Sequence, residues 1–329
     1  MPPSINRQTP PRQSALPAQD SILSTAIPVT QLREQWAKLC IYGRNRSGKT
    51  TLAAQFKKRI LIISTEPDAC GGATSISNME DISIIRVSNV MLGQNEKGEW
   101  VNADDPTCVR KDKVKGSTKV VLLARELAAN NPFATVVFDT VTSLQDIILV
   151  ELMGLSKVPE MLSWGTVPDG VYQGRAEKLR ETLRPLLELQ NCNLVILAQE
   201  KDHNAQEDRS GKSKLMHTMQ MGSFMAPALG STNAQWLQDN CGYVVQIYED
   251  EVTQEVQIPR VDARGQPLPP SVQKVGTGKR QRHLRLLYHP NFAAGPRFVY
   301  NPTIPEFVTA PTPKELYEAM AQFIPALRR

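Results

Sequence analysis

The sequence has few cysteines, and they do not follow the spacing of a metal site or a disulfide framework. Five cysteines are scattered over 329 residues, at positions 40, 70, 108, 192 and 241, and none forms a C-x-x-C pair. Structural zinc sites and disulfide scaffolds are recognised by clustered cysteines. We therefore expect neither, and we interpret the cysteines as free, buried thiols of a reducing cytosol.

Long apolar runs are also missing. No run approaches the roughly 18 residues that a helix needs to cross a bilayer. The N-terminal segment lacks the apolar stretch of a secretory signal, and no internal repeat is present. These absences predict a cytoplasmic protein with no membrane partner. The net charge of +5 permits a polyanionic partner without requiring one.

The order of apolar and amphipathic segments predicts an α/β core between about residues 31 and 250. Strand-length apolar runs occupy 39–43, 59–65, 82–87, 134–139, 193–198 and 243–248. Helix-like stretches occupy 49–58, 119–130, 142–153 and 171–190. Near-continuous apolar strands that alternate with amphipathic helices are typical of a mostly parallel sheet covered on both faces.

Four segments depart from this pattern. Residues 1–30 are rich in Pro, Ser and Gln and predict a flexible arm. Residues 88–117 are polar and turn-rich, and 200–232 mix glycine, serine, charges and methionines. Loops of this length within a domain are usually functional or disordered. Residues 251–329 predict a small β-rich extension followed by a terminal helix.

The clearest motif is G-x-x-x-x-G-K-T in "LCIYGRNRSGKTTLAAQF", between a strand-like and a helix-like run. Gly43 permits the turn, and Gly48 lets the backbone approach phosphates at a helix N-terminus. Lys49 would neutralise the β and γ phosphates, and the Thr50 hydroxyl would ligate Mg²⁺. The motif therefore predicts ATP and Mg²⁺ as ligands. Further contacts, mainly through the backbone, are expected from Arg44, Asn45, Arg46, Ser47 and Thr51.

Polar residues follow three other predicted strands, at the sheet edge where open α/β sheets carry their active sites. Asp139 ends "ATVVFD" and would hold Mg²⁺ through a water or a hydroxyl, or cap the helix that follows. Glu66 would serve as general base, or is a strand-end acid before a turn. Gln199 would sense the γ-phosphate, or simply ends its strand.

Together these segments resemble the RecA-like ATPase core, and more narrowly the phage-type RecA-like AAA-domain ATPases and Sak-type single-strand annealing recombinases. The matching segments are "KLCIYGRNRSGKTTLAAQF", "ILIISTEPD", "TVVFDTVTSL", "WGTVPDGVYQGRAEKLRETLRPLLEL", "NLVILAQEKDH" and "FMAPALGSTNAQWLQDNCGYVVQIY". They follow that family's order from about residue 38 to 248. The resemblance implies a catalytic glutamate at Glu66, phosphate and magnesium contacts at Lys49 and Thr50, a Walker B acid at Asp139, and a sensor at Gln199.

The resemblance also implies loops that bind single-stranded DNA after the third and fifth core strands, here 154–170 and 201–232. Phosphate contacts need lysine and arginine, and base stacking needs aromatic rings. A solvated loop without DNA contacts is the alternative. The candidate residues in the second loop are Lys201, Arg209, Lys212, Lys214 and Phe224.

A basic residue from a neighbouring subunit often completes sites of this kind. We therefore expect a homo-oligomer, either a ring or a filament. The candidates are Lys279, Arg285 and Arg297. The basic stretch 274–289 is either one solvated face of a strand or a DNA-facing hairpin.

The leading interpretation is a DNA-dependent ATPase that acts on single-stranded DNA in recombination, annealing or replication. It would work in the bacterial host cytoplasm if phage-encoded, with replication or recombination proteins as further partners. One alternative is a hexameric helicase or packaging motor. Another is a nucleotide-gated assembly or loader factor that does not bind DNA.

Overall fold

The computed structural model describes thirteen stretches of the chain. They are 36–66, 75–76, 79–87, 92–97, 100–102, 108–114, 116–153, 169–202, 225–229, 231–261, 266–287, 292–296 and 303–328. The chain divides into two units, Met1–Glu34 and Gln35–Arg329. All described residues belong to the second unit, and the arm predicted over 1–30 lies outside them.

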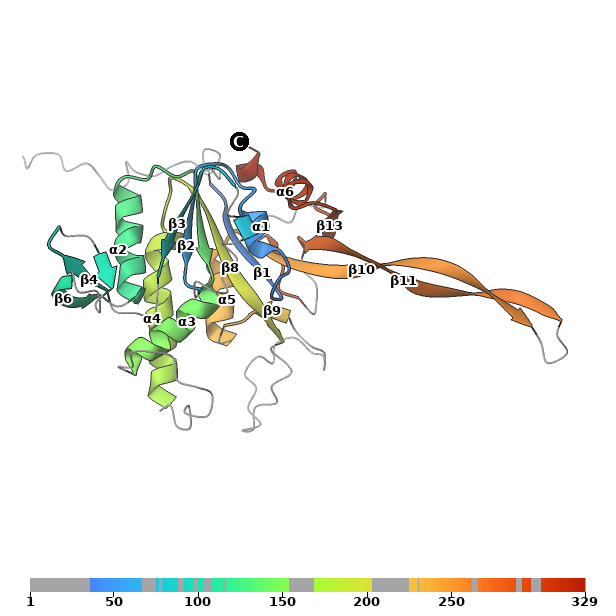
Figure 1. Cartoon of the computed structure of the whole chain (residues 1–329), viewed down its shortest axis with the longest axis horizontal. Coiled ribbons are helices and arrows are strands. Elements are labelled where there is room, and N and C mark those ends of the chain that lie inside the picture. Colours follow the sequence, from blue (N-terminus) through green and yellow to red (C-terminus); the bar gives the residue numbers. More distant parts are fainter. Residues whose placement is uncertain are drawn as a thin grey trace, which may run out of the picture. The chain divides into compact units, whose positions relative to one another are not determined.

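The core of this unit is a 10-stranded sheet, in which six neighbouring strands run parallel (Figure 1). Their order is β3-β2-β7-β8-β1-β10. The bounds are β1 (Lys38–Gly43), β2 (Ile60–Ser64), β3 (Ile82–Arg86), β7 (Thr135–Asp139), β8 (Asn193–Asp202) and β10 (Tyr243–Val261). The strand that precedes the phosphate loop is therefore separated from the strand that ends at Asp139 by β8.

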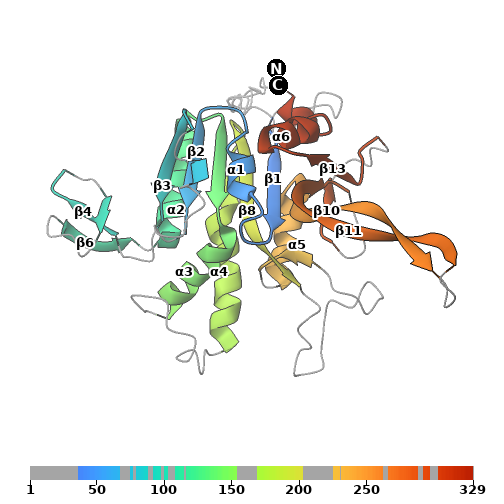
Figure 2. The same ribbon diagram turned by 45° about the vertical axis from the view of Figure 1, so that its right-hand side comes forward.

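Helices cover both faces of the sheet (Figure 2). They are α1 (Lys49–Ala53), α2 (Gly116–Ala129), α3 (Val141–Leu152), α4 (Asp169–Leu187), α5 (Ser231–Asn240) and α6 (Pro313–Ala321). Along β1, Leu39 and Ile41 pack with α1 and α6, whereas Cys40 and Tyr42 pack with the other four helices. This alternation explains why the strands read as continuous apolar runs. The predicted fold class is confirmed as a mixed α/β core, with a mostly parallel sheet and helices on both faces.

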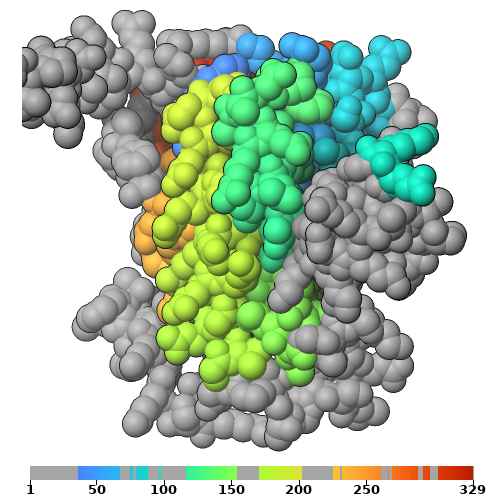
Figure 3. All heavy atoms as spheres, turned by 90° about the vertical axis from the view of Figure 1, so that its left-hand side faces the viewer, coloured from blue at the N-terminus to red at the C-terminus, as the bar shows by residue number. Residues whose placement is uncertain are grey.

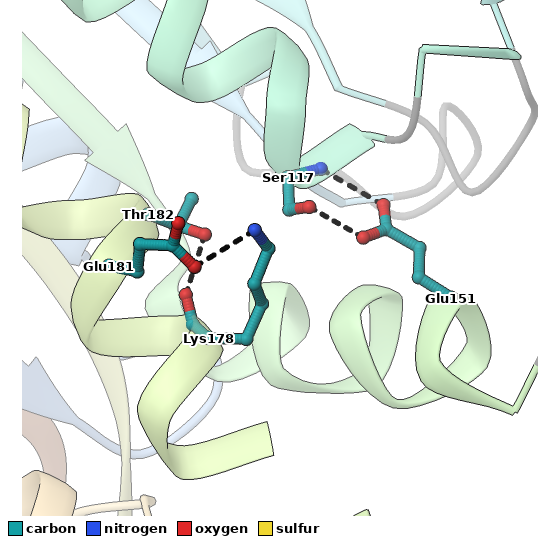
Figure 4. A network of polar contacts seen from close by, with 5 residues as sticks. All are labelled: Ser117, Glu151, Lys178, Glu181 and Thr182. Atoms are coloured by element: carbon teal, nitrogen blue, oxygen red, sulfur yellow. Dashed lines mark hydrogen bonds and ion pairs between the residues drawn. The ribbon is translucent and has the colours of Figure 1, made fainter. Parts of the chain in front are cut away.

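The helices α2 and α4 lie side by side on one outer face of the sheet (Figure 3). The N-terminus of α2 is capped by a side chain of α3. The Ser117 backbone N–H and hydroxyl donate to the two carboxylate oxygens of Glu151 (Figure 4). Orphan N–H groups at a helix start need such acceptors. In the core, Cys40, Cys192 and Cys241 are buried, and none of these three is in a disulfide.

The described part of 88–117 contains a small second sheet. Its three antiparallel strands are β4 (Leu92–Asn95), β5 (Trp100–Asn102) and β6 (Cys108–Val114), in the order β5-β4-β6. The sequence predicted only a polar excursion here, because these short strands carry no apolar alternation. α1 is also shorter than the predicted helix over 49–58, since its C-terminal cap is Ala54.

Past the core, β10 continues into a two-stranded ribbon with β11 (Pro267–Arg285), which Figure 1 shows leaving the sheet. Near the core, β11 also pairs with β13 (Phe307–Ala310), and β10 with β12 (Gly295–Pro296). From Thr253 onward, the described pairing is between β10 and β11 alone. The domain boundary predicted at residue 250 falls inside β10. The remaining short strand, β9 (Met225–Pro227), pairs with β8.

None of the described helices combines the length and apolar character that crossing a membrane requires.

Candidate functional site

The phosphate loop connects β1 to α1, and its two glycines serve different purposes. Gly48 has φ of 93°, in the left-handed region that favours glycine. Gly43 belongs to β1, where an added Cβ atom would lie 2.2 Å from the carbonyl oxygen of Ile247. The sequence suggested that Gly43 permits a turn. The structure gives another reason, because glycine lets β10 approach this closely.

Buried polar atoms line the loop. The Ser47 hydroxyl is buried and has no hydrogen-bond partner among the described residues. The Lys49 ammonium donates to the carbonyl oxygens of Gly43 and Arg44, at 2.9 and 2.8 Å. The pKa of Lys49 is below its usual value, because burial lowers it more than the nearby carboxylates of Asp139, Glu66 and Glu200 raise it. An unsatisfied hydroxyl and a lysine folded over the loop fit a site built for an anion.

Asp139 and Thr50 are joined directly. The Thr50 hydroxyl of α1 donates to Oδ2 of Asp139, at the end of β7, at 2.8 Å. Asp139 is only 2% exposed, and burial raises its pKa to about 6, with the nearby Glu66 adding to the rise. The capping role considered for Asp139 belongs to Thr140, whose side chain accepts from the Ser143 N–H. A carboxylate beside a hydroxyl is an oxygen pair suited to Mg²⁺.

A cavity of about 570 Å³ lies at the carboxyl ends of the parallel strands. It brings together most of the residues predicted from separate motifs, because parallel strands end at one edge of the sheet. Its lining includes the predicted residues Asn45, Arg46, Gly48, Lys49, Thr50, Thr51, Glu66, Asp139 and Gln199. We call it the phosphate-side cavity.

The predicted loop residues Arg44 and Ser47 line a second cavity of about 750 Å³, which Asn45 and Arg46 also border. Arg285 lies there too and is engaged within its own chain. Its guanidinium is 3.2 Å from Glu306 and 4.1 Å from the centre of the Phe292 ring. Its proposed role toward a neighbouring subunit remains a prediction.

The structure describes only some of the residues predicted to bind DNA or to reach a neighbouring subunit. Lys201 is exposed near the end of β8, and Lys279 is exposed on β11. The others lie outside the described residues: Arg209, Lys212, Lys214, Phe224 and Arg297.

Four lining residues were missed by the sequence reasoning: Ser75, Thr140, Ser143 and Arg282. Arg282 of β11 reaches the phosphate-side cavity. The signal that could have found it is the alternation in "RQRHLRLL", which sets Arg282 on the same strand face as Leu284 and Leu286. Both leucines are buried in the core on the α1 face of the sheet.

Comparison with known proteins places the chain in a family. A family model described as AAA domain matches residues 35–298. A search of curated proteins found no match. The flagellar accessory protein FlaH from Methanocaldococcus jannaschii is a similar solved structure, with 9% identity, a TM-score of 0.33, and coverage of 82% of this chain and 83% of that one. With most of its length matched and a complete phosphate loop, the chain belongs to the AAA domain family of P-loop ATPases.

Proposed function

We propose that the protein binds and hydrolyses ATP with Mg²⁺ while acting on single-stranded DNA, as a homo-oligomer, in recombination, annealing or replication. The observation that carries the ATPase part is the hydrogen bond between Thr50 and Asp139 beside the loop lysine. It joins the two groups that the sequence assigned to Mg²⁺, from motifs 89 residues apart.

The residues of the cavity divide the chemistry among them. Lys49 exchanges its two backbone carbonyl partners for phosphate oxygens, and the loop N–H groups bind the same anion. Thr50 and Asp139 would hold Mg²⁺, which when bound neutralises charge on the phosphates. Glu66 orients a water and accepts its proton, and Gln199 contacts the terminal phosphate.

Two features support the DNA and oligomer parts of the proposal. The exposed Lys201, near the end of β8, is two residues beyond Gln199, which lines the cavity. A change at the terminal phosphate could therefore pass to a DNA-contacting loop. The ribbon carries solvent-exposed apolar side chains that a partner subunit would bury. These are Val252, Val256, Ile258, Val272 and Val275.

The narrower identity we propose is a phage-encoded recombinase of the Sak type that works in the host cytoplasm. It is supported by the order of the motifs along the chain.

A nucleotide-gated assembly factor is the second candidate. The ribbon favours it, because acidic residues on β10 face basic residues on β11, as in the pair of Glu249 and Arg280 at 3.5 Å. Such balanced charge suits a protein partner, whereas DNA binding requires an excess of lysine and arginine.

The test is ATP hydrolysis by the purified protein with and without single-stranded DNA. We expect stimulation by DNA, and a loss of roughly 100-fold or more in Lys49→Ala and Glu66→Gln. Hydrolysis that ignores DNA, together with no DNA binding at low salt, would favour the assembly factor. Absence of hydrolysis and of nucleotide binding would overturn both candidates.

A further inference from the structure

Arg282 lies on β11 where strands on both sides fix its backbone. It pairs with Glu249 of β10 and with Ala310 of β13. Alternate residues of a strand point to the same face, and Leu284 is buried in the same cluster as Leu52 of α1. The side chain of Arg282 therefore extends on the α1 face of the sheet.

On that face, the guanidinium reaches the start of α1. Its Nε atom lies 3.3 Å from the position that a Cβ atom would take at Gly48. Arg282 is the only residue of β10 or β11 among the described residues that line the phosphate-side cavity. Glu66 and Gln199 line the same cavity. Arg282 and the two residues proposed for hydrolysis thus border one cavity.

The guanidinium is held loosely by its own chain. Its Nε atom is buried and makes no hydrogen bond within the described part of the structure. The nearest carboxylate oxygen, Glu249 Oε1, is 3.6 Å away, which is too long for a hydrogen bond. Glu249 is also shared, because Arg280 approaches its other oxygen to 3.5 Å. A buried donor without an acceptor is costly, so a ligand that supplies an acceptor here is favoured.

We propose that Arg282 binds the terminal phosphate of a nucleoside triphosphate in the phosphate loop, and that this phosphate replaces Glu249 as its partner. The inference rests on the proposed ATP site and adds a cation supplied by the same chain. A guanidinium matches phosphate in geometry and charge. With a diphosphate bound, Arg282 stays with Glu249. The base of the ribbon therefore differs between the two nucleotide states.

The test is isothermal titration calorimetry with Mg²⁺ and either AMP-PNP or ADP. For Arg282→Ala, we expect the affinity for AMP-PNP to fall by roughly 10- to 100-fold, which is the value of a charge-assisted hydrogen bond, while ADP affinity changes by less than about 3-fold. Arg280→Ala is the matched control, because Arg280 shares Glu249 and the strand face but does not line the cavity. Glu249→Gln should raise the affinity for AMP-PNP.

Each outcome bears on a different part of the proposal. If Arg282→Ala binds AMP-PNP like the wild type while Lys49→Ala does not bind it, the inference falls and the ATP site stands. Equal losses for AMP-PNP and ADP would also overturn it, since the terminal phosphate would not be involved. If the wild type binds neither nucleotide, both fall. The fitted stoichiometry separates a misfolded fraction from a change in affinity, and Arg282→Lys should retain part of the preference.

Discussion

Asp139 shows, at the level of single residues, that a side chain suited to holding a metal ion can destabilise the fold around it. Its carboxylate is nearly inaccessible, and the Thr50 hydroxyl is the hydrogen-bond donor to it. Its pKa is raised from 3.8 to about 6 in the folded chain, chiefly by burial. Ionisation of this group therefore destabilises the folded state when no cation is bound. A metal ion removes this penalty, so binding and stability are linked at this residue.

The first prediction concerns Asp139→Asn. An acid whose folded pKa lies above its unfolded value costs the fold most at high pH, and this cost disappears as pH falls below both values. We therefore expect the variant to be more stable than the wild type by up to about 3 kcal/mol at pH 8, and by little at pH 4. Urea unfolding at both pH values, with EDTA and without nucleotide, measures this.

Addition of Mg²⁺ and AMP-PNP serves as the control, since it should stabilise the wild type and not the variant. A difference between the two proteins that does not depend on pH would contradict the raised pKa.

The sequence predicted most residues of the cavity at this scale and missed four, of which Arg282 alone is charged. Asp139, Glu66 and Gln199 each follow an apolar run, so their shared edge follows from parallel strands alone. Arg282 required knowledge that β11 pairs with β10 in one particular register, with Glu249 opposite. Polar strands specify register weakly, so this neighbour could not be derived from the pattern.

Among the elements, the contact of β1 with β10 sets the tightest steric constraint on the loop. Gly43 faces the backbone of β10 at Ile247, and neither strand can move away, because β8 holds β1 and β11 holds β10 on their other sides. A backbone atom cannot rotate out of the way as a side chain can. The glycine at the end of β1 is therefore required for packing as well as for nucleotide binding.

The second prediction compares two glycine substitutions. Gly43→Ala should cost about 3 kcal/mol of stability, because the added methyl group meets a fixed carbonyl oxygen. Gly48→Ala should cost about 1–2 kcal/mol, because it strains a left-handed residue while its steric neighbour, Arg282, is a flexible side chain. Denaturant unfolding without nucleotide gives both values. Equal costs would show that the close approach of β10 is not the controlling contact.

The third prediction concerns the cap that joins α2 to α3. Glu151→Ala removes both acceptors from the Ser117 N–H and hydroxyl, at 2.9 and 2.6 Å, and should cost about 1–2 kcal/mol. Glu181→Ala is the matched control, since its ion pair with Lys178 lies on one exposed helix surface (Figure 4). That control should cost less than about 0.5 kcal/mol. Thermal unfolding of the two variants measures both losses of stability. The prediction fails if the two variants are equally stable.

At the scale of the whole molecule, the ribbon is the feature that the sequence described least well. A β-rich extension was expected after residue 250, but not that β10 would run for 19 residues from the core outward. Outside the core both faces of the ribbon contact solvent, so its residues lose the apolar alternation that identifies a strand. Most of its residues are accordingly exposed.

The fourth prediction is that the outer ribbon can be removed without loss of the core. Thr253 and Gly276 are opposite one another, so an Asn-Gly turn can replace 254–275. Since the described pairing there is between β10 and β11 alone, the unfolding midpoint should change by less than about 3 °C. If the exposed apolar residues bind a second copy, self-association measured by sedimentation should fall.

A large drop in the unfolding midpoint would instead show that the ribbon supports the core. The same protein with Val272→Ser and Val275→Ser in an intact ribbon is the control for the apolar contact, since both residues are exposed.

Because β10 runs without a break from the core into the ribbon, the length of the ribbon can vary independently of the phosphate loop. The phosphate loop is in contact with the inner end of the strand, and beyond Thr253 the described pairing of β10 is with β11 alone. Each residue inserted in both strands would extend the ribbon by about 3.4 Å, and steps of two would preserve which side chains point to which side. The ribbon can therefore be lengthened or shortened without altering the phosphate loop.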